Sequence, residues 1–334
     1  MRILFAGSSG IAAPCLDLLS EMETEGKDLQ LVAILTNPDA PRGRSNTPIP
    51  TEISVSAGVL SLLRVNKGFS PVVQFRFEKL DSLARERIAA SRCDLLVSFA
   101  YGRIFGPKFL SLFPMGGINI HPSLLPKYRG PSPISAAIMN NDSETGITIQ
   151  MLSPEIDAGD ILAQRRFSLD GDETAGSLSE SLSREAAVLL SEVMPDLISG
   201  SAKRQPQQGE AVYCKMITKE QGHIDWNLSA KEIDALVRAY YPWPLCFTQY
   251  RDETLFISRG CVPKGEDLNI NSAYPYSVTP LPGYVLGIDR VNGILIQTGD
   301  GVFAVSRLQR QAKKVLEWRD FLNGARDFIG SRLE

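Results

Sequence analysis

The chain has 334 residues, of which 43% are hydrophobic and 22% are charged, and its formal net charge at pH 7 is −3. This length and composition predict a globular protein with two domains, and the negative charge argues against a general nucleic-acid-coating protein. No apolar run approaches the ~20 residues that span a bilayer, and the N-terminus lacks the pattern of a signal peptide, so we expect a cytoplasmic protein.

The cysteines and histidines also limit the possible chemistry. The five cysteines are scattered and form no C-x-x-C pair, which is typical of free thiols in a reducing compartment. With only two histidines in addition, we expect no metal site.

The first half alternates strand-like and helix-like segments. Arg2–Ala6 is a buried-strand pattern, and a helix is expected to begin near Ala13. The G-S-S-G stretch between them could hold an anion on its free N–H groups, but a tight crossover turn is the simpler interpretation. Further strands are expected at 29–35, 70–74, 94–101 and 118–121. Helices are expected within 51–69 and at 77–91 and 133–140, with a further short helix near Pro107. This order predicts an α/β fold with a doubly wound, mostly parallel, Rossmann-like sheet.

A proline-rich loop is predicted at 36–50. It contains four prolines and a small basic centre with Arg42 and Arg44. Loops of this length inside a compact domain are usually functional or disordered, although two arginines in an exposed loop can also be merely solvated.

The stretch 116–130, GGINIHPSLLPKYRG, contains one of the two histidines. On an extended strand, Asn119 and His121 point to the same face. An amide can donate a hydrogen bond to a developing oxyanion and an imidazole can accept or donate a proton, so the pair suits acyl transfer at the carboxyl end of a strand. The alternative is a loop histidine beside a turn-forming asparagine.

Two strands, at 146–152 and 161–169, are predicted to run antiparallel around a D-A-G-D turn. Asp157 and Asp160 are the acidic residues of this turn. Taken alone, the turn is explained by ordinary Asx-turn chemistry.

A long helix at 174–198 and a polar linker at 199–208 separate the two expected domains, at 1–198 and 209–334. The second domain shows short strand patterns at 255–258, 283–289, 293–297 and 302–308, and one helix at 230–240. Several short strands with little helix predict a small OB-like β-barrel.

Residues 119–130 read N-x-H-x-S-L-L-P-x-x-x-G, which resembles the signature of the formyltransferases that use 10-formyltetrahydrofolate. The resemblance implies that Asn119 and His121 are catalytic and that Asp157 lies beside the histidine. It also implies that the formyl donor, 10-formyltetrahydrofolate, lies against Ser123, Leu124, Leu125, Pro126, Tyr101 and Gly102.

Other segments resemble the tRNA-specific members of this family. These are the P-R-G-R loop, the I-D-W-N-L-S element at 224–229 and the Y-P-W-P element at 241–244. The resemblance implies that Arg42 and Arg44 grip the acceptor stem, with fewer phosphate contacts than usual because Ser45–Thr47 replaces the expected lysines. Lys313 and Lys314, in a basic cluster at 307–319, are candidate phosphate contacts, although a solvated basic face explains the cluster equally well.

The implied reaction is transfer of a formyl group to the α-amine of methionine esterified to initiator tRNA, by a monomeric enzyme. Three other functions fit the same residues less well. They are formylation of an amino-sugar nucleotide or other small amine, formylation of glycinamide ribonucleotide, and inactive RNA or nucleotide binding.

Overall fold

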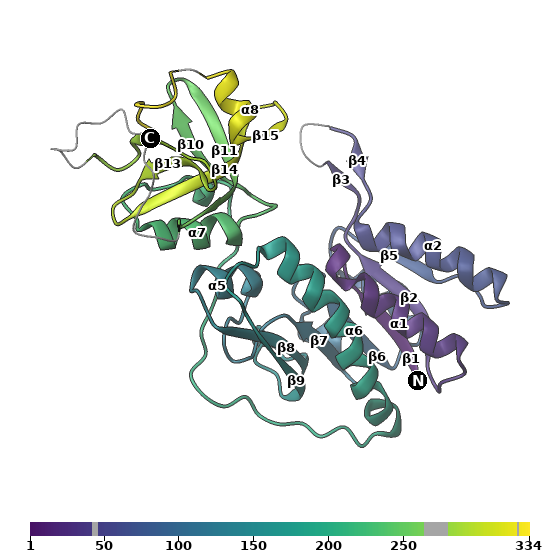
Figure 1. The fold of residues 1–334 in the computed structure, drawn as a ribbon. Helices are drawn as coiled ribbons and strands as arrows, with labels where there is room; N and C mark the ends of the chain where they lie inside the picture. Colours follow the sequence, from purple (N-terminus) through teal and green to yellow (C-terminus); the bar gives the residue numbers. More distant parts are fainter. Residues whose placement is uncertain (42–45, 264–279, 326) are drawn as a thin grey trace. The chain divides into compact units, whose positions relative to one another are not determined.

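The computed structural model describes residues 1–41, 46–263, 280–325 and 327–334 (Figure 1). The chain divides into two compact units. Unit 1 comprises residues 1–133, 144–168 and 179–215, and unit 2 comprises 134–143, 169–178 and 216–334. The predicted division at 199–208 stays a prediction.

Unit 1 is built on a seven-stranded sheet in the order β5-β2-β1-β6-β7-β8-β9. The strands are β1 (Arg2–Ala6), β2 (Gln30–Thr36), β5 (Val73–Arg76), β6 (Leu95–Phe99), β7 (Gly117–His121), β8 (Glu144–Met151) and β9 (Ile161–Ser168). The first five in this order are parallel, whereas β8 and β9 each pair antiparallel with their neighbours. The predicted mostly parallel, Rossmann-like sheet is confirmed.

Helices connect the parallel strands (Figure 1). They are η1 (Gly10–Ala12), α1 (Ala13–Thr24), α2 (Glu52–Asn66), α3 (Ser82–Ala89) and α4 (Pro107–Leu110). The long helix α6 (Ala175–Ser199) follows β9, the last strand of the sheet. Leu4 and Ala6 of β1 pack with Ile88 of α3 and Phe109 of α4 in one apolar cluster. The alternate residues of β1 are also fully buried, so both faces of the central strand are covered.

Two local predictions need correction. The segment 36–50 is not a loop throughout, because β3 (Ala40–Pro41) and β4 (Pro48–Ile49) pair antiparallel. Arg42 and Arg44 lie between these strands and outside the described residues. The helix predicted at 77–91 is shorter, since α3 begins only after Asp81, whose carboxylate caps the helix by accepting the N–H of Ala84.

Unit 2 is built on an antiparallel sheet in the order β10-β11-β14-β13-β12, with β15 paired to β14. Its elements are α5 (Pro133–Met139), η2 (Glu220–Gly222), α7 (Ala230–Ala239), β10 (Cys246–Tyr250), β11 (Glu253–Cys261), β12 (Val285–Asp289), β13 (Gly293–Gln297), β14 (Val302–Arg310), β15 (Val315–Glu317) and α8 (Trp318–Asn323). The sequence patterns did not predict β10, β15 or α8.

The C-terminal residues connect the two edge strands of this sheet. The carbonyl of Ser331 accepts the N–H of Val285 in β12, and the carbonyl of Glu334 accepts the N–H of Gln249 in β10. The tail therefore satisfies backbone groups of both edges, as expected for a small closed barrel.

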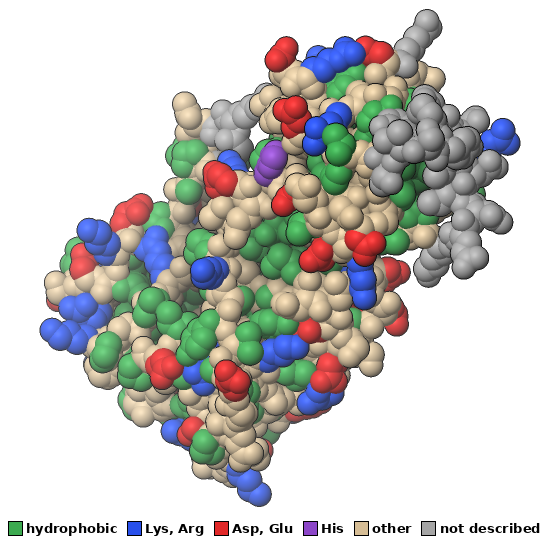
Figure 2. All heavy atoms as spheres, turned by 90° about the vertical axis from the view of Figure 1, so that its left-hand side faces the viewer, with side chains coloured by type: hydrophobic (Ala, Val, Ile, Leu, Met, Phe, Trp, Pro, Cys, Tyr) green, Lys and Arg blue, Asp and Glu red, His purple; other side chains and the backbone are tan. Residues whose placement is uncertain are grey.

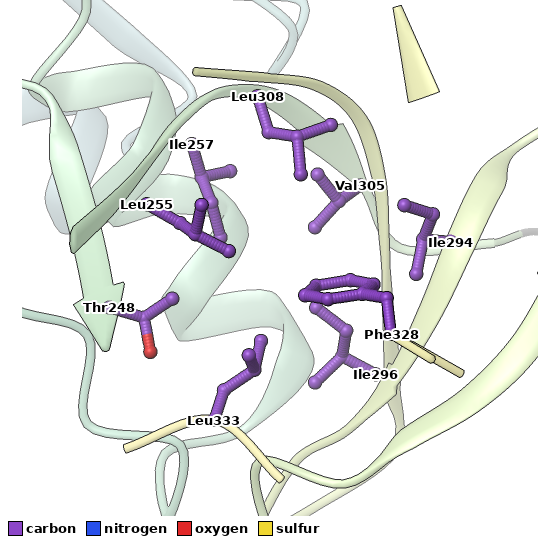
Figure 3. A pocket seen from close by; sticks show the side chains of 9 residues that line it. All are labelled: Thr248, Leu255, Ile257, Ile294, Ile296, Val305, Leu308, Phe328 and Leu333. Carbon is purple, nitrogen blue, oxygen red and sulfur yellow. The ribbon is translucent and has the colours of Figure 1, made fainter. Parts of the chain in front are cut away.

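The interior of unit 2 is a packed core. Eight of the nine side chains drawn in Figure 3 are apolar, and the ninth, Thr248, is hydrogen-bonded to the Trp226 ring N–H at 2.9 Å and to the Glu334 carbonyl at 2.8 Å. The remaining cavity of about 10 Å³ holds at most one water molecule. In the part of the chain that the structure describes, no helix is long and apolar enough to cross a membrane.

Candidate active site

Asn119 and His121 lie on the same face of β7, two residues apart. The antiparallel strand β8 places Gln150 opposite Asn119 and Thr148 opposite His121. Because side chains alternate along both strands, these four polar groups form one patch near the carboxyl end of β7.

Asp157 joins this patch from the loop between β8 and β9. Its Oδ1 accepts hydrogen bonds from Asn119 Nδ2 at 3.3 Å and from Gln150 Nε2 at 3.0 Å. Its Oδ2 accepts the N–H of Gly130 at 2.9 Å and lies 3.6 Å from His121 Nδ1. The three residues that were predicted to be catalytic are therefore together in space.

The contacts of His121 determine which ring nitrogen is protonated. Nε2 lies 2.9 Å from the carbonyl oxygen of Tyr128, which can only accept, so Nε2 carries a hydrogen. Nδ1 faces the Asp157 carboxylate at 3.6 Å, slightly beyond a hydrogen bond. The buried imidazole is thus held between the Tyr128 carbonyl and the Asp157 carboxylate, with Nδ1 on the side of the carboxylate.

The backbone of the Asp157 loop explains the D-A-G-D spacing. Asp157 has φ 51°, in the left-handed region, where aspartate is better tolerated than most residues. At Gly159, a Cβ atom would lie 1.8 Å from the carbonyl oxygen of Met151. Only glycine allows the loop to pass this close to β8.

The S-L-L-P turn follows β7 and is hydrogen-bonded to β8. Ser123 Oγ donates to the Lys127 carbonyl at 2.6 Å, and Thr148 Oγ1 donates to the Ser123 carbonyl at 2.7 Å. Ser123 and Leu125 are 1% and 4% exposed, whereas Leu124 and Pro126 are partly exposed. Of the four predicted folate contacts, only Leu124 and Pro126 therefore present side-chain surface.

Tyr101 and Gly102 follow β6, the parallel neighbour of β7. The Tyr101 ring is buried and stacked on Phe105, with ring centroids 5.1 Å apart, and burial raises the pKa of its hydroxyl. Its carbonyl accepts a hydrogen bond from Asn37 Nδ2 at 2.8 Å. Gly102 is exposed, so the accessible part of this predicted contact is its backbone.

Lys313 and Lys314 lie in the turn between β14 and β15 and are exposed. Within the same basic cluster, Arg307 pairs with Glu317, and Arg310 pairs with Glu253. On the face drawn in Figure 2, the basic and acidic side chains of the described residues are interspersed. In the hairpin formed by β14 and β15, Lys313 and Lys314 are thus the two cations that form no ion pair with another described residue.

Four further polar residues surround the site and were not predicted: Thr148, Gln150, Gln207 and Arg129. The alternation of G-I-T-I-Q-M places Thr148 and Gln150 on one face of a buried strand, and this pattern could have indicated them. Gln207 carries no such signal, because it lies in a polar segment without periodicity.

The two parts of the chain match two related sequence families. Residues 1–194 match the family described as formyl transferase, and residues 216–326 match the formyl transferase C-terminal domain. The chain belongs to the formyl transferase family. The resemblance inferred from the N-x-H-x-S-L-L-P motif is confirmed.

The formyltransferase similarity extends over the whole chain. A methionyl-tRNA formyltransferase of Treponema denticola is 42% identical over 341 aligned positions, which cover 100% of both proteins. Among solved structures, HypX of Aquifex aeolicus in complex with tetrahydrofolic acid has a TM-score of 0.63 at 18% identity, over 98% of this chain and 48% of that one. The sugar 3N-formyl transferase WlaRD, crystallised with dTDP and 5-N-formyl-THF, has a TM-score of 0.60 at 19% identity, over 94% and 99% of the two chains. At these identities the two structures show a shared fold.

Proposed function

We propose that this formyltransferase transfers the formyl group of 10-formyltetrahydrofolate to the α-amine of methionine carried by initiator tRNA. The observation that carries the proposal is the 42% identity, over the full length of both chains, to a protein named methionyl-tRNA formyltransferase. The aligned region includes both domains of the chain. We therefore extend the similarity to the acceptor as well as to the formyl transfer chemistry. With a charged tRNA as acceptor, the enzyme would act in the cytoplasm.

The folate expectation is supported by the fold and by the surface of the turn. Two formyltransferase-fold structures contain tetrahydrofolic acid or 5-N-formyl-THF. In this chain the partly exposed Leu124 and Pro126 and the exposed backbone of Gly102 follow β7 and β6, which are parallel neighbours. The pterin would contact these groups, while the buried Ser123 and Leu125 shape the turn.

In the proposed reaction the acceptor amine attacks the formyl carbon. A new C–N bond forms, the carbonyl oxygen becomes negative, and the bond to N10 of the folate then breaks. One N–H of Asn119 Nδ2 is used by Asp157, and the second would donate to the oxyanion. In this structure both nitrogens of the His121 ring have other partners, the Tyr128 carbonyl and the Asp157 carboxylate, so we assign the ring to proton transfer. The amine loses one proton and N10 gains one, and the His121–Asp157 pair would relay this proton.

The tRNA would be held by cations of both units. We assign this role to Arg42 and Arg44, which lie outside the described residues, and to the exposed Lys313 and Lys314. Neutralising phosphates releases counterions, so such contacts predict binding that weakens with salt.

A small amine is the second candidate acceptor, because the sugar 3N-formyl transferase WlaRD shares this fold. The two acceptors are distinguished by supplying 10-formyltetrahydrofolate with methionyl-initiator tRNA, methionyl-elongator tRNA or an amino-sugar nucleotide. We expect rapid labelling of the initiator tRNA that is lost in His121→Ala. Labelling of the sugar alone would assign the small-amine reaction, and labelling of none of the three would refute the enzyme proposal.

A further inference from the structure

Gln207 lies in the segment that was predicted to be a linker, but this segment is attached to the catalytic unit. The N–H and carbonyl of Gln205 pair with those of Ile161, the first residue of β9, at 2.9 and 2.7 Å. Farther along, the carbonyl of Arg129 accepts the N–H of Cys214 at 2.8 Å. The backbone around Gln207 is therefore held on both sides against the elements that carry the site.

The side-chain amide of Gln207 faces three acceptors with its nitrogen. Nε2 lies 2.8 Å from the Asp157 carbonyl, 2.9 Å from the Gly159 carbonyl and 3.2 Å from Gln150 Oε1. Its Oε1 accepts two hydrogen bonds from the Arg129 guanidinium, at 2.8 and 3.1 Å. If the amide were flipped, its oxygen would face three acceptors and its nitrogen would face the donors of Arg129. The observed orientation therefore satisfies both the oxygen and the nitrogen.

These contacts restrain Asp157 along two routes. Gln207 binds the backbone of the loop at Asp157 itself and at Gly159. It also binds the amide oxygen of Gln150, whose Nε2 donates to Asp157 Oδ1. Because Asp157 is in the left-handed region, its conformation needs such external support.

Arg129 fixes the direction of the Gln207 amide. Its side chain is 11% exposed, and besides Gln207 it contacts Glu155 Oε1 at 3.3 Å and the Tyr213 hydroxyl at 3.1 Å. A guanidinium only donates, so it holds the oxygen of Gln207 toward itself and the nitrogen toward the Asp157 loop.

We propose that Gln207 is a positioning residue that holds the Asp157 carboxylate against His121 and Asn119. The segment around Gln207 is then part of the active site, although it follows the catalytic motifs by many residues and contacts no reacting atom. The kinetic test of this inference rests on the proposed formyl transfer, and a spectroscopic test does not.

Two variants separate the donor role of Gln207 from its bulk. Gln207→Met keeps the length of the side chain and loses both hydrogen-bonding ends. Gln207→Glu keeps an acceptor for Arg129 but places an oxygen against three acceptor oxygens. The matched control is Gln208→Met, because Gln208 is exposed and has no side-chain hydrogen bond among the described residues.

For both Gln207 variants we expect kcat about 10- to 100-fold below that of Gln208→Met, since a misplacement of ~1 Å can cost ~10²-fold. The KM values for both substrates should stay within about 3-fold, because the placement of Asp157 rather than substrate binding is changed. A kcat of either variant within 2-fold of the control would overturn the donor role.

The second readout is the ring C–H NMR signal of His121 at a fixed pH. His121 and His223 are the only two histidines, so a His223→Gln spectrum assigns the signal. We expect it to move in Gln207→Met and Gln207→Glu but not in Gln208→Met. If the wild type transfers no formyl group, the proposed function fails, and this signal alone decides the positioning role: movement supports it, and an unchanged signal overturns it.

Discussion

The Asp157 oxygen that accepts the N–H of Gly130, Oδ2, is the one that lies 3.6 Å from His121 Nδ1. The other oxygen, Oδ1, accepts from the amides of Asn119 and Gln150. The Asp157 carboxylate therefore acts as the acceptor in each of these hydrogen bonds. A neutral amide at position 157 cannot receive them all, because one of its two heavy atoms is itself a donor.

Asp157→Asn should therefore lower both activity and stability. We expect kcat to fall by ~10²-fold, because the substituted side chain turns away from His121 or Asn119. The free energy of unfolding should fall by about 1–3 kcal/mol, because one buried donor loses its acceptor. Single-turnover formyl transfer and urea unfolding measure the two effects. The exposed Asp28→Asn is the control, and equal values for the two variants would remove Asp157 from the site.

Asn119→Ala tests the oxyanion contact. The loss of one such donor typically lowers kcat by ~10²–10³-fold while KM changes little. Steady-state kinetics with both substrates separates the two parameters, and Asn66→Ala, an exposed residue at the end of α2, is the matched control. An Asn119→Ala enzyme with kcat within a few-fold of wild type would show that the amide does not contact the oxyanion.

The double variant Lys313→Gln/Lys314→Gln tests the hairpin between β14 and β15 as a tRNA contact. If both lysines neutralise phosphates, the slope of log affinity against log salt should become shallower by about 1 for each. Filter binding of charged tRNA between low and physiological salt measures it. Lys27→Gln/Lys67→Gln is the control, because these exposed residues follow α1 and α2 at the end of the sheet away from the active site. Equal slopes for the two double variants would show that the hairpin does not contact the phosphates of the tRNA.

A stability prediction concerns the buried ion pair of unit 1. Arg64 Nη1 lies 2.5 Å from Glu23 Oε2, and the two side chains are 4% and 8% exposed. Glu23→Gln leaves the guanidinium charge buried and uncompensated, so the free energy of unfolding should fall by about 3–5 kcal/mol.

The exposed pair Arg184–Glu180 on α6 provides the comparison for this prediction. Glu180→Gln should change the free energy of unfolding by less than ~1 kcal/mol, because both partners are solvated. Urea denaturation followed by circular dichroism measures both variants. If Glu23→Gln changed the free energy of unfolding as little as Glu180→Gln does, the Arg64–Glu23 pair would not be buried as described.

The cysteines should react slowly in the native protein. Burial raises the pKa of Cys246 to about 12 and also raises the pKa values of Cys15, Cys93, Cys214 and Cys261. Since the thiolate is the reactive form, burial keeps Cys246 almost entirely in the unreactive thiol form at pH 8. Labelling with a thiol reagent at pH 8, followed by mass spectrometry, should find modification only at the partly exposed Cys214 and Cys261, and at all five after unfolding. Rapid native labelling of Cys246 would contradict its burial.

Local patterns were enough to predict much of this protein. Alternation along 118–121 placed Asn119 and His121 on one face, because the period of a strand follows from backbone geometry alone. The alternation of strands and helices likewise predicted the mostly parallel sheet of unit 1. The short hairpin elements β3, β4 and β15 escaped prediction, since two or three residues carry no detectable period.

Only the tertiary structure decided how the site is assembled. The antiparallel register of β7 and β8 places Gln150 beside Asn119, and the left-handed turn at Asp157 directs its carboxylate to the same point. Gln207 reaches this loop from a segment whose sequence is only polar, and the tail at Glu334 meets β10 in the same unforeseen way. Contacts of this kind depend on register, loop geometry and chain closure, which are set by the packing of the whole unit and leave no periodic trace in the sequence.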